Sequence, residues 1–104
     1  MKVLVAVPTK RGMLFRRAND SVLQLEWDDQ LDIMYLLGGD PDPLYWNNLL
    51  TKLNDARAIA LNGGYDALLT IESDIIVPPD ALKKMAAVDA DVVYGLFALR
   101  LRFS

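Results

Sequence analysis

Hydrophobic positions along the chain alternate between short unbroken runs and stripes with helical spacing. An unbroken run rich in branched residues is typical of a strand that is covered on both faces. A stripe that recurs every three or four residues is typical of one face of a helix. The predicted strands are residues 3–7, 31–37, 67–71 and 91–101. The predicted helices carry the stripes Leu14-Ala18-Val22-Leu25, Leu49-Leu53-Ala56-Ala60 and Leu82-Met85-Ala86.

The resulting order, βαβαβαβ, predicts an α/β fold. Strands that alternate with amphipathic helices form a mostly parallel sheet through right-handed crossovers, with helices on both faces. We therefore expect a Rossmann-like three-layer sandwich. Turn signals close the second strand at Gly38-Gly39-Asp40-Pro41 and the second helix at Asn62-Gly63-Gly64. A chain of 104 residues without repeats or linkers is expected to form a single domain, residues 1–104.

Composition narrows the chemistry that this fold can carry. The chain has no Cys and no His, which excludes a disulfide framework, a thiolate metal site and the usual zinc ligands. A net charge of −3 gives no general reason to bind nucleic acid or an anionic membrane. The opening apolar run stops at Pro8, too short for a signal peptide or a membrane span. We expect a soluble cytoplasmic protein whose chemistry rests on carboxylates, hydroxyls, basic side chains and backbone amides.

Two acidic residues interrupt the apolar segment that follows the third predicted strand. In parallel α/β sheets, ligands bind beyond the carboxyl ends of the strands, which is where Glu72 and Asp74 fall. Alternation along a strand would point both side chains the same way, about 6.6 Å apart at the backbone. Carboxylates without His or Cys favour Mg²⁺ or Mn²⁺, which often shares its ligands with phosphate oxygens. The alternative is that both acids are only polar strand ends, with Asp74 accepting backbone hydrogen bonds in the next turn.

A basic cluster follows the first predicted strand and consists of Lys10, Arg11, Arg16 and Arg17. Arg and Lys both bind phosphate, and Arg11 is the member of the cluster nearest the strand end. The alternative is a solvated helix face. The chain contains neither a Gly-x-Gly-x-x-Gly motif nor a phosphate-loop Lys-Ser/Thr signature. A dinucleotide dehydrogenase or a P-loop enzyme is therefore disfavoured.

An ordered series of motifs covers nearly the whole chain and resembles the nucleotide-sugar glycosyltransferases of the GT-A fold, especially the family 2-like group. The series comprises Lys2–Thr9, Asn54–Arg57, Tyr65–Asp74, Pro78–Leu82 and Ala90–Gly95. The resemblance implies a GT-A-like half-domain that holds a nucleoside diphosphate sugar, UDP- or GDP-linked, with Mn²⁺ or Mg²⁺ as cofactor.

The resemblance also implies roles for individual residues. Glu72-Ser73-Asp74 matches the Asp-X-Asp metal motif, in which Asp74 is the direct metal ligand and Glu72 the other acid. The remaining matches are Pro8 and Thr9 in the loop that lines the base and ribose, Asp40 at a nucleoside contact, and Arg57 near the nucleotide. The chain departs from the family at Glu72, where Asp is usual, and at Ala58, where many relatives carry Asn.

Family members are usually longer, with the acceptor site and the catalytic base in their later half. We therefore expect a glycosyltransferase or its donor-binding half, apparently truncated relative to the full family fold, and no catalytic base or acceptor is assigned. The alternative is a non-catalytic nucleotide-binding or assembly module. In that case the alternating Phe97, Leu99, Leu101 and Phe103 of the last predicted strand would form a homo-oligomer contact.

Overall fold

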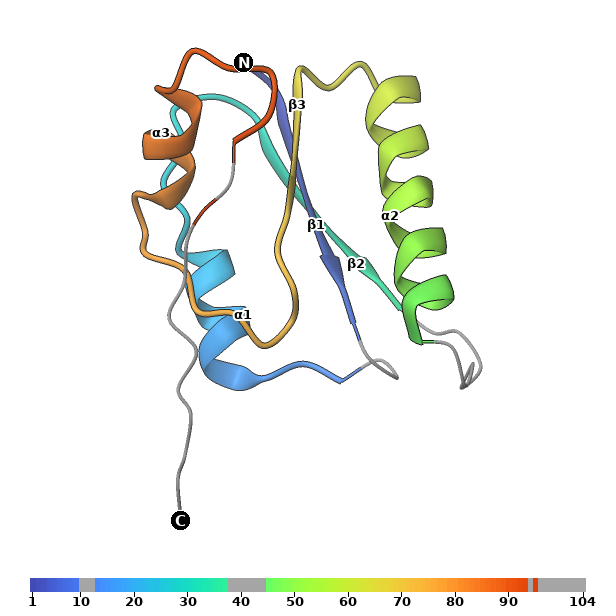
Figure 1. Cartoon of the computed structure of the whole chain (residues 1–104). Coiled ribbons are helices and arrows are strands. Elements are labelled where there is room, and N and C mark those ends of the chain that lie inside the picture. The colour runs from blue at the N-terminus through green and yellow to red at the C-terminus, as the bar shows by residue number, and fades with distance from the viewer. Residues whose placement is uncertain (10–12, 38–44, 94, 96–104) are drawn as a thin grey trace.

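Strands and helices alternate along the chain in this computed structural model (Figure 1). The structure describes residues 1–9, 13–37, 45–93 and 95, and for residues 45–48 it describes the backbone alone. The elements are β1 (Val3–Pro8), α1 (Arg16–Leu23), β2 (Leu31–Leu36), α2 (Tyr45–Asn62), β3 (Ala67–Thr70) and α3 (Ala81–Ala86). The α/β fold predicted from the sequence is confirmed.

The described strands form one parallel sheet in the order β2-β1-β3. β1 pairs with β2 from Val3↔Leu31 to Pro8↔Leu36. On its other side, β1 pairs with β3 from Val3 opposite Ala67 to Ala6 opposite Thr70. Every residue of β1 is buried, as expected for the central strand of a sheet that is covered on both faces.

Helices cover both faces of this sheet, which gives three layers (Figure 1). α1 and α3 lie on one face, where Val22 and Leu82 join a core cluster with Val3, Val5 and Val7 of β1. α2 lies on the opposite face and is in contact with β1 and β3. Among residues 49–62 of this helix, the buried ones are Ala56 and Ala60, two members of the predicted stripe.

The order of the strands creates a switch point beside β1. From β1 the chain crosses to β2 on one side, and from β2 it returns to β3 on the other side. The connection that leaves β1 leads to α1 on one face of the sheet, and the connection that leaves the adjacent β2 leads to α2 on the opposite face, so these two connections diverge at the carboxyl ends of their strands. In open α/β sheets a ligand binds in the crevice that this divergence leaves.

Several details differ from the sequence prediction. Leu14 precedes α1 and is exposed, because the chain around Phe15 is still extended, with φ −89° and ψ 123°. β3 ends at Thr70, one residue earlier than expected. Most of the fourth predicted strand, residues 91–101, lies outside the described residues, and its described residues 91–93 and 95 are not in a strand. In the described ranges, no helix combines the length and the hydropathy needed to cross a membrane.

Candidate functional site

The candidate site lies at the carboxyl edge of the sheet, a name used here for Pro8 and Thr9, Leu36, Lys52 and the segment Ile71–Ile75. The acidic residues follow directly from the end of β3. Ile71 N–H donates a hydrogen bond of 3.0 Å to the Ala6 carbonyl, which is the last bond of the β1–β3 ladder. The chain then turns, and Ile75 N–H donates a hydrogen bond of 3.1 Å to the Glu72 carbonyl. Because the acids lie in a turn, strand alternation does not set their spacing, and that part of the sequence reasoning was wrong.

Apolar residues on both sides of the turn fix it to the core. Ile71 is buried in the core cluster, and the half-buried Ile75 and Val77 pack against the same cluster. Val77 N–H also donates a hydrogen bond of 3.1 Å to the Ser21 hydroxyl of α1. This anchoring holds the turn in place from both ends. It leaves the short stretch of Glu72, Ser73 and Asp74 at the surface, with Ser73 half-buried between the two exposed acids.

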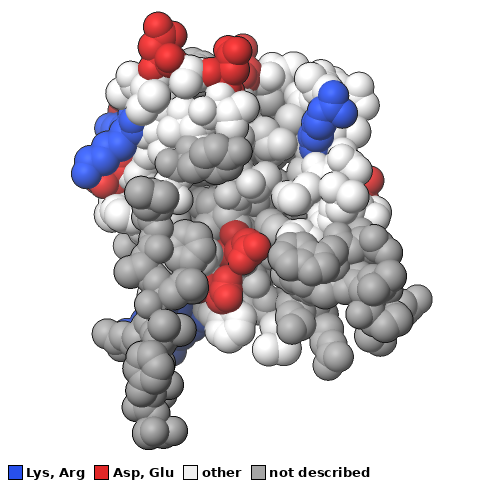
Figure 2. Space-filling view, viewed as in Figure 1, with Lys and Arg blue, Asp and Glu red and all other residues white. Residues whose placement is uncertain are grey.

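The carboxylates of Glu72 and Asp74 have no hydrogen bond or ion pair with any residue that the structure describes. On the face shown in Figure 2, one acidic group lies near the centre, between the α1–α3 side and the α2 side of the molecule. The described ranges contain no cluster of three or more acids that could enclose a metal ion. Two free carboxylates suit an ion such as Mg²⁺ or Mn²⁺, which takes one or two carboxylates and completes its shell with phosphate oxygens and water.

Thr9 joins the ends of β1 and β2. The residue is only 3% exposed, and its hydroxyl donates a hydrogen bond of 3.0 Å to the Leu36 carbonyl. Its N–H donates to the same carbonyl at 3.1 Å. The preceding Pro8 is buried as well. The structure thus places both residues at the expected edge, but it uses the Thr9 hydroxyl inside the fold.

The basic residue that α2 brings to the carboxyl edge is Lys52. Its ammonium donates a hydrogen bond of 2.6 Å to the Thr9 carbonyl. Arg57 is exposed on the same helix. At a rise of 1.5 Å per residue, it lies about 7.5 Å further along the helix axis than Lys52, away from this edge. The sequence interpretation named Arg57 and missed Lys52. The predicted topology could have indicated Lys52. A helix that follows a parallel strand begins at the carboxyl edge, and its earlier residues therefore lie closer to that edge than its later ones.

Other expected site residues lie elsewhere. Arg11 and Asp40 are outside the described residues. Arg16 and Arg17, the described members of the basic cluster, are exposed in the first turn of α1.

Shifted pKa values occur at the opposite, amino edge of the sheet. The Tyr65 hydroxyl donates a hydrogen bond to Asp32, which lowers the pKa of that carboxyl, and a second bond from the Gln30 side chain lowers it further. The same Tyr65–Asp32 bond raises the pKa of the Tyr65 phenol. These groups stabilise the protein by binding each other.

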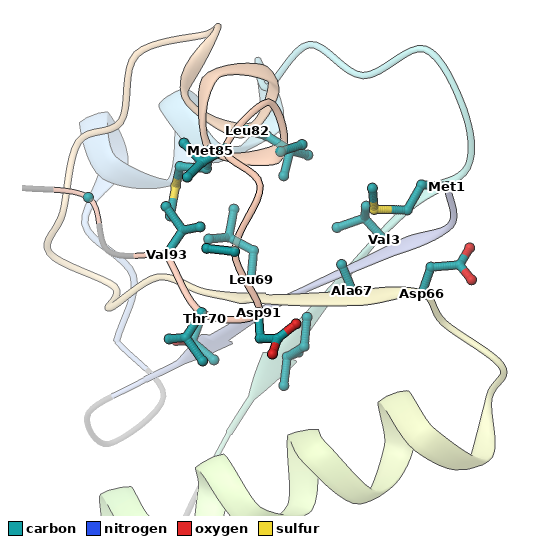
Figure 3. A pocket seen from close by; sticks show the side chains of 16 residues that line it. Met1, Val3, Asp66, Ala67, Leu69, Thr70, Leu82, Met85, Asp91 and Val93 are labelled. Carbon is teal, nitrogen blue, oxygen red and sulfur yellow. The ribbon is translucent and has the colours of Figure 1, made fainter.

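A cavity of about 690 Å³ lies beside β3, between the strand, α3 and residues 88–93 and 95. Leu82 and Met85 point from α3 toward Leu69 and Val93 across it (Figure 3). Its other lining residues include Met1 and Asp66 at the amino edge, but none of the residues of the candidate site. Its described lining contains no basic side chain, so this cavity is poorly suited to a diphosphate.

The carboxyl edge therefore combines two carboxylates that bind none of the described residues, an ammonium on α2 and the switch point of a parallel sheet. Comparison of the chain with protein-family models, with curated proteins and with solved structures finds no match.

Proposed function

We propose that the chain binds a nucleoside diphosphate sugar at the carboxyl edge, through a divalent metal ion held by Asp74 together with Glu72. In this proposal it acts as a glycosyltransferase or as the donor-binding half of one. The observation that carries the proposal is a pair of exposed carboxylates that no described residue binds, in a turn that the core anchors at the same edge of the sheet as the switch point. The resemblance of the sequence motifs to GT-A glycosyltransferases supports the choice of ligand.

Each part of the edge has a task in this proposal. Asp74 and Glu72 supply hard oxygen ligands, which suit Mn²⁺ or Mg²⁺. When bound, such an ion supplies Lewis-acid stabilisation of the diphosphate leaving group. The buried Pro8 and Thr9 fix the end of β1, whose main chain ends at the same edge of the sheet. Cytoplasmic location and assembly through the last predicted strand stay predictions.

Calorimetric titration with UDP and with GDP, in MnCl₂ and in EDTA, tests the proposal. We expect binding of one nucleotide that depends on Mn²⁺ and that Asp74→Asn weakens about tenfold or more, since charge-assisted contacts contribute about 1.5–3 kcal/mol. Asp89→Asn is the matched control, because Asp89 is exposed beyond α3, outside the carboxyl edge. Binding that is equal in EDTA and in Asp74→Asn would contradict the metal-dependent site.

A second measurement separates the enzyme from the module. With the preferred nucleotide known, its common sugar conjugates are incubated with the protein and Mn²⁺, and release of the nucleoside diphosphate is followed by chromatography. Release that Asp74→Asn abolishes would support an enzyme. Tight binding without release or transfer would favour the non-catalytic alternative.

A further inference from the structure

Lys52 differs from the other described lysines in how its charge is compensated. Lys83 forms ion pairs with Glu26 and Asp28, and Lys84 forms one with Asp80. Lys2 lies 4.4 Å from the centre of the Tyr65 ring and also donates to the Gly63 carbonyl. Lys52, by contrast, has one bond, to the Thr9 carbonyl, and no carboxylate or aromatic ring among the described residues binds it.

Lys52 is half-buried, as Lys2 and Lys83 are, but unlike them it has no ion pair or ring contact with a described residue. Burying a charge costs free energy unless a partner compensates it, and a single backbone carbonyl is a weak compensation. An ammonium has three N–H donors, and Lys52 uses one of them inside the fold. No described residue accepts a hydrogen bond from the other two donors, so these donors and the positive charge are available to an anion at the carboxyl edge.

The bond to Thr9 fixes where that anion would lie. The Thr9 carbonyl is at the end of β1, the strand beside the switch point. On the other side of β1, the turn with Glu72 and Asp74 begins one residue after the last β1–β3 bond. An anion between these segments would face the ammonium from α2 and the metal ligands from β3. A diphosphate, with its several oxygens and negative charges, suits both at once.

We infer that Lys52 is the α2 residue that contacts the diphosphate of the ligand, in place of Arg57. This inference rests on the proposed function. The bond to the Thr9 carbonyl positions the ammonium, and its other two N–H groups donate to phosphate oxygens. Lys52 thus compensates part of the diphosphate charge from the side of the ligand opposite the carboxylates.

The test compares variants by titration with UDP or GDP, whichever the wild type binds, and with the matching nucleoside, which lacks the phosphates. Lys52→Gln removes the charge but keeps a side-chain donor for the Thr9 carbonyl. Lys52→Arg keeps the charge. Lys84→Gln is the matched control, since it makes the same replacement on α3, outside the carboxyl edge. Arg57→Gln removes a charge from the rival position on the same helix.

We expect Lys52→Gln to weaken nucleoside diphosphate binding about tenfold, the effect of losing one charge-assisted contact. Nucleoside binding should stay the same, Lys52→Arg should restore most of the affinity, and Arg57→Gln should have a smaller effect than Lys52→Gln. Thermal melting of each variant checks that the fold is intact. If Lys52→Gln weakens nucleoside and diphosphate binding equally, its role is structural and the inference is wrong.

The outcomes also separate this inference from the proposed function. A wild type that binds neither UDP nor GDP, with or without Mn²⁺, would overturn both. Mn²⁺-dependent binding that Asp74→Asn abolishes and Lys52→Gln leaves unchanged would overturn only the role of Lys52. An effect of Arg57→Gln larger than that of Lys52→Gln would return the phosphate contact to Arg57.

Discussion

The two edges of the sheet use their charged side chains in opposite ways. At the amino edge, Asp66 accepts a hydrogen bond of 2.8 Å from the Lys2 N–H, and Tyr65 binds both Asp32 and the Lys2 ammonium. At the carboxyl edge, Glu72 and Asp74 bind none of the described residues. Both edges belong to the same sheet. A position at a sheet edge therefore does not explain why the acids of one edge have hydrogen-bond partners and those of the other have none among the described residues.

The comparison separates side chains that hold the fold from those available to a ligand. Polar groups at the amino edge hold the ends of β1, β2 and β3 together. At the carboxyl edge the same work is done by apolar residues, Ile71 and Ile75, and by the internal bonds of Thr9. Glu72 and Asp74 therefore make none of the described contacts that hold this edge of the fold. Substitutions at the amino edge should therefore change stability, and those at the carboxyl-edge acids should change ligand affinity.

The largest effect on stability is expected for Gly63→Ala. A Cβ at this position would lie 2.7 Å from the Tyr65 ring and 3.0 Å from the Ile59 carbonyl. Because Asp32 and Lys2 hold the ring, it cannot move away freely, and overpacking of this kind costs about 2 kcal/mol. Urea denaturation measures the loss. In a Tyr65→Ala background the cost of Gly63→Ala should shrink, and an undiminished cost there would show that the ring is not the obstacle.

Next in size is a matched pair of Asp→Ala replacements at the two edges. Asp66→Ala removes the acceptor of the Lys2 N–H and should lower the free energy of unfolding by about 1 kcal/mol. Asp74→Ala removes no internal bond and should change it by less than about 0.5 kcal/mol. Both are measured by urea denaturation without metal. If both variants lose the same free energy of unfolding, the acids of the two edges do not differ in their contribution to stability.

Thr9→Val tests a residue of the carboxyl edge whose side chain forms a hydrogen bond inside the fold. The hydroxyl donates to the Leu36 carbonyl, which also accepts the Thr9 N–H, so the carbonyl keeps one partner. We expect a loss of at most about 1 kcal/mol in the free energy of unfolding. The effect should appear in denaturation rather than in nucleotide titration. A large loss of affinity with unchanged stability would mean that the hydroxyl turns toward the ligand.

The smallest effect is a dependence of stability on pH that comes from the amino edge. The hydrogen bond from Tyr65 lowers the pKa of Asp32, so its stabilisation is present above about pH 4 and is lost as the pH falls through the lowered pKa. The raised pKa of Tyr65 gives stabilisation that is present below about pH 10 and is lost as the pH rises through the raised pKa.

Tyr65→Phe removes the bond that causes both shifts. Melting temperatures of the wild type and this variant, measured across both pH ranges, should converge at the acidic and alkaline ends and differ most between them. Parallel profiles at a constant difference would show that the bond does not titrate with these groups. Asp20→Asn, an exposed acid of α1, is the control for general charge effects.

The sequence predicted the elements well because periodicity reports burial directly. β1 reads as an unbroken apolar run, and it is the central strand. The turn at Glu72 was not predicted, because Ile75 and Val77 continue the apolar pattern of β3 and pack on the same core after the chain has turned. Periodicity along the chain cannot distinguish a strand from a turn that returns to the same core.

The roles of single side chains were harder to predict than the elements. The Thr9 hydroxyl binds Leu36, a residue 27 positions away, and Lys52 binds Thr9 over 43 positions. Such pairings depend on how the strands and α2 are placed, and local patterns carry no information on them. The acids could be placed at the carboxyl edge from the sequence because the end of a strand is itself a local feature.

The placement of α3 restricts how the sheet can grow. α3 covers the same face as α1 (Figure 1), and a crossover of the same hand on the same face must advance in the same direction. From β1 that direction leads to β2. From β3 the same direction leads to the side of β3 that is already paired with β1. A parallel neighbour on the outer side of β3 would thus require the rare left-handed connection if it followed α3 directly. A segment that follows α3 directly and extends the sheet there is therefore expected to run antiparallel to β3.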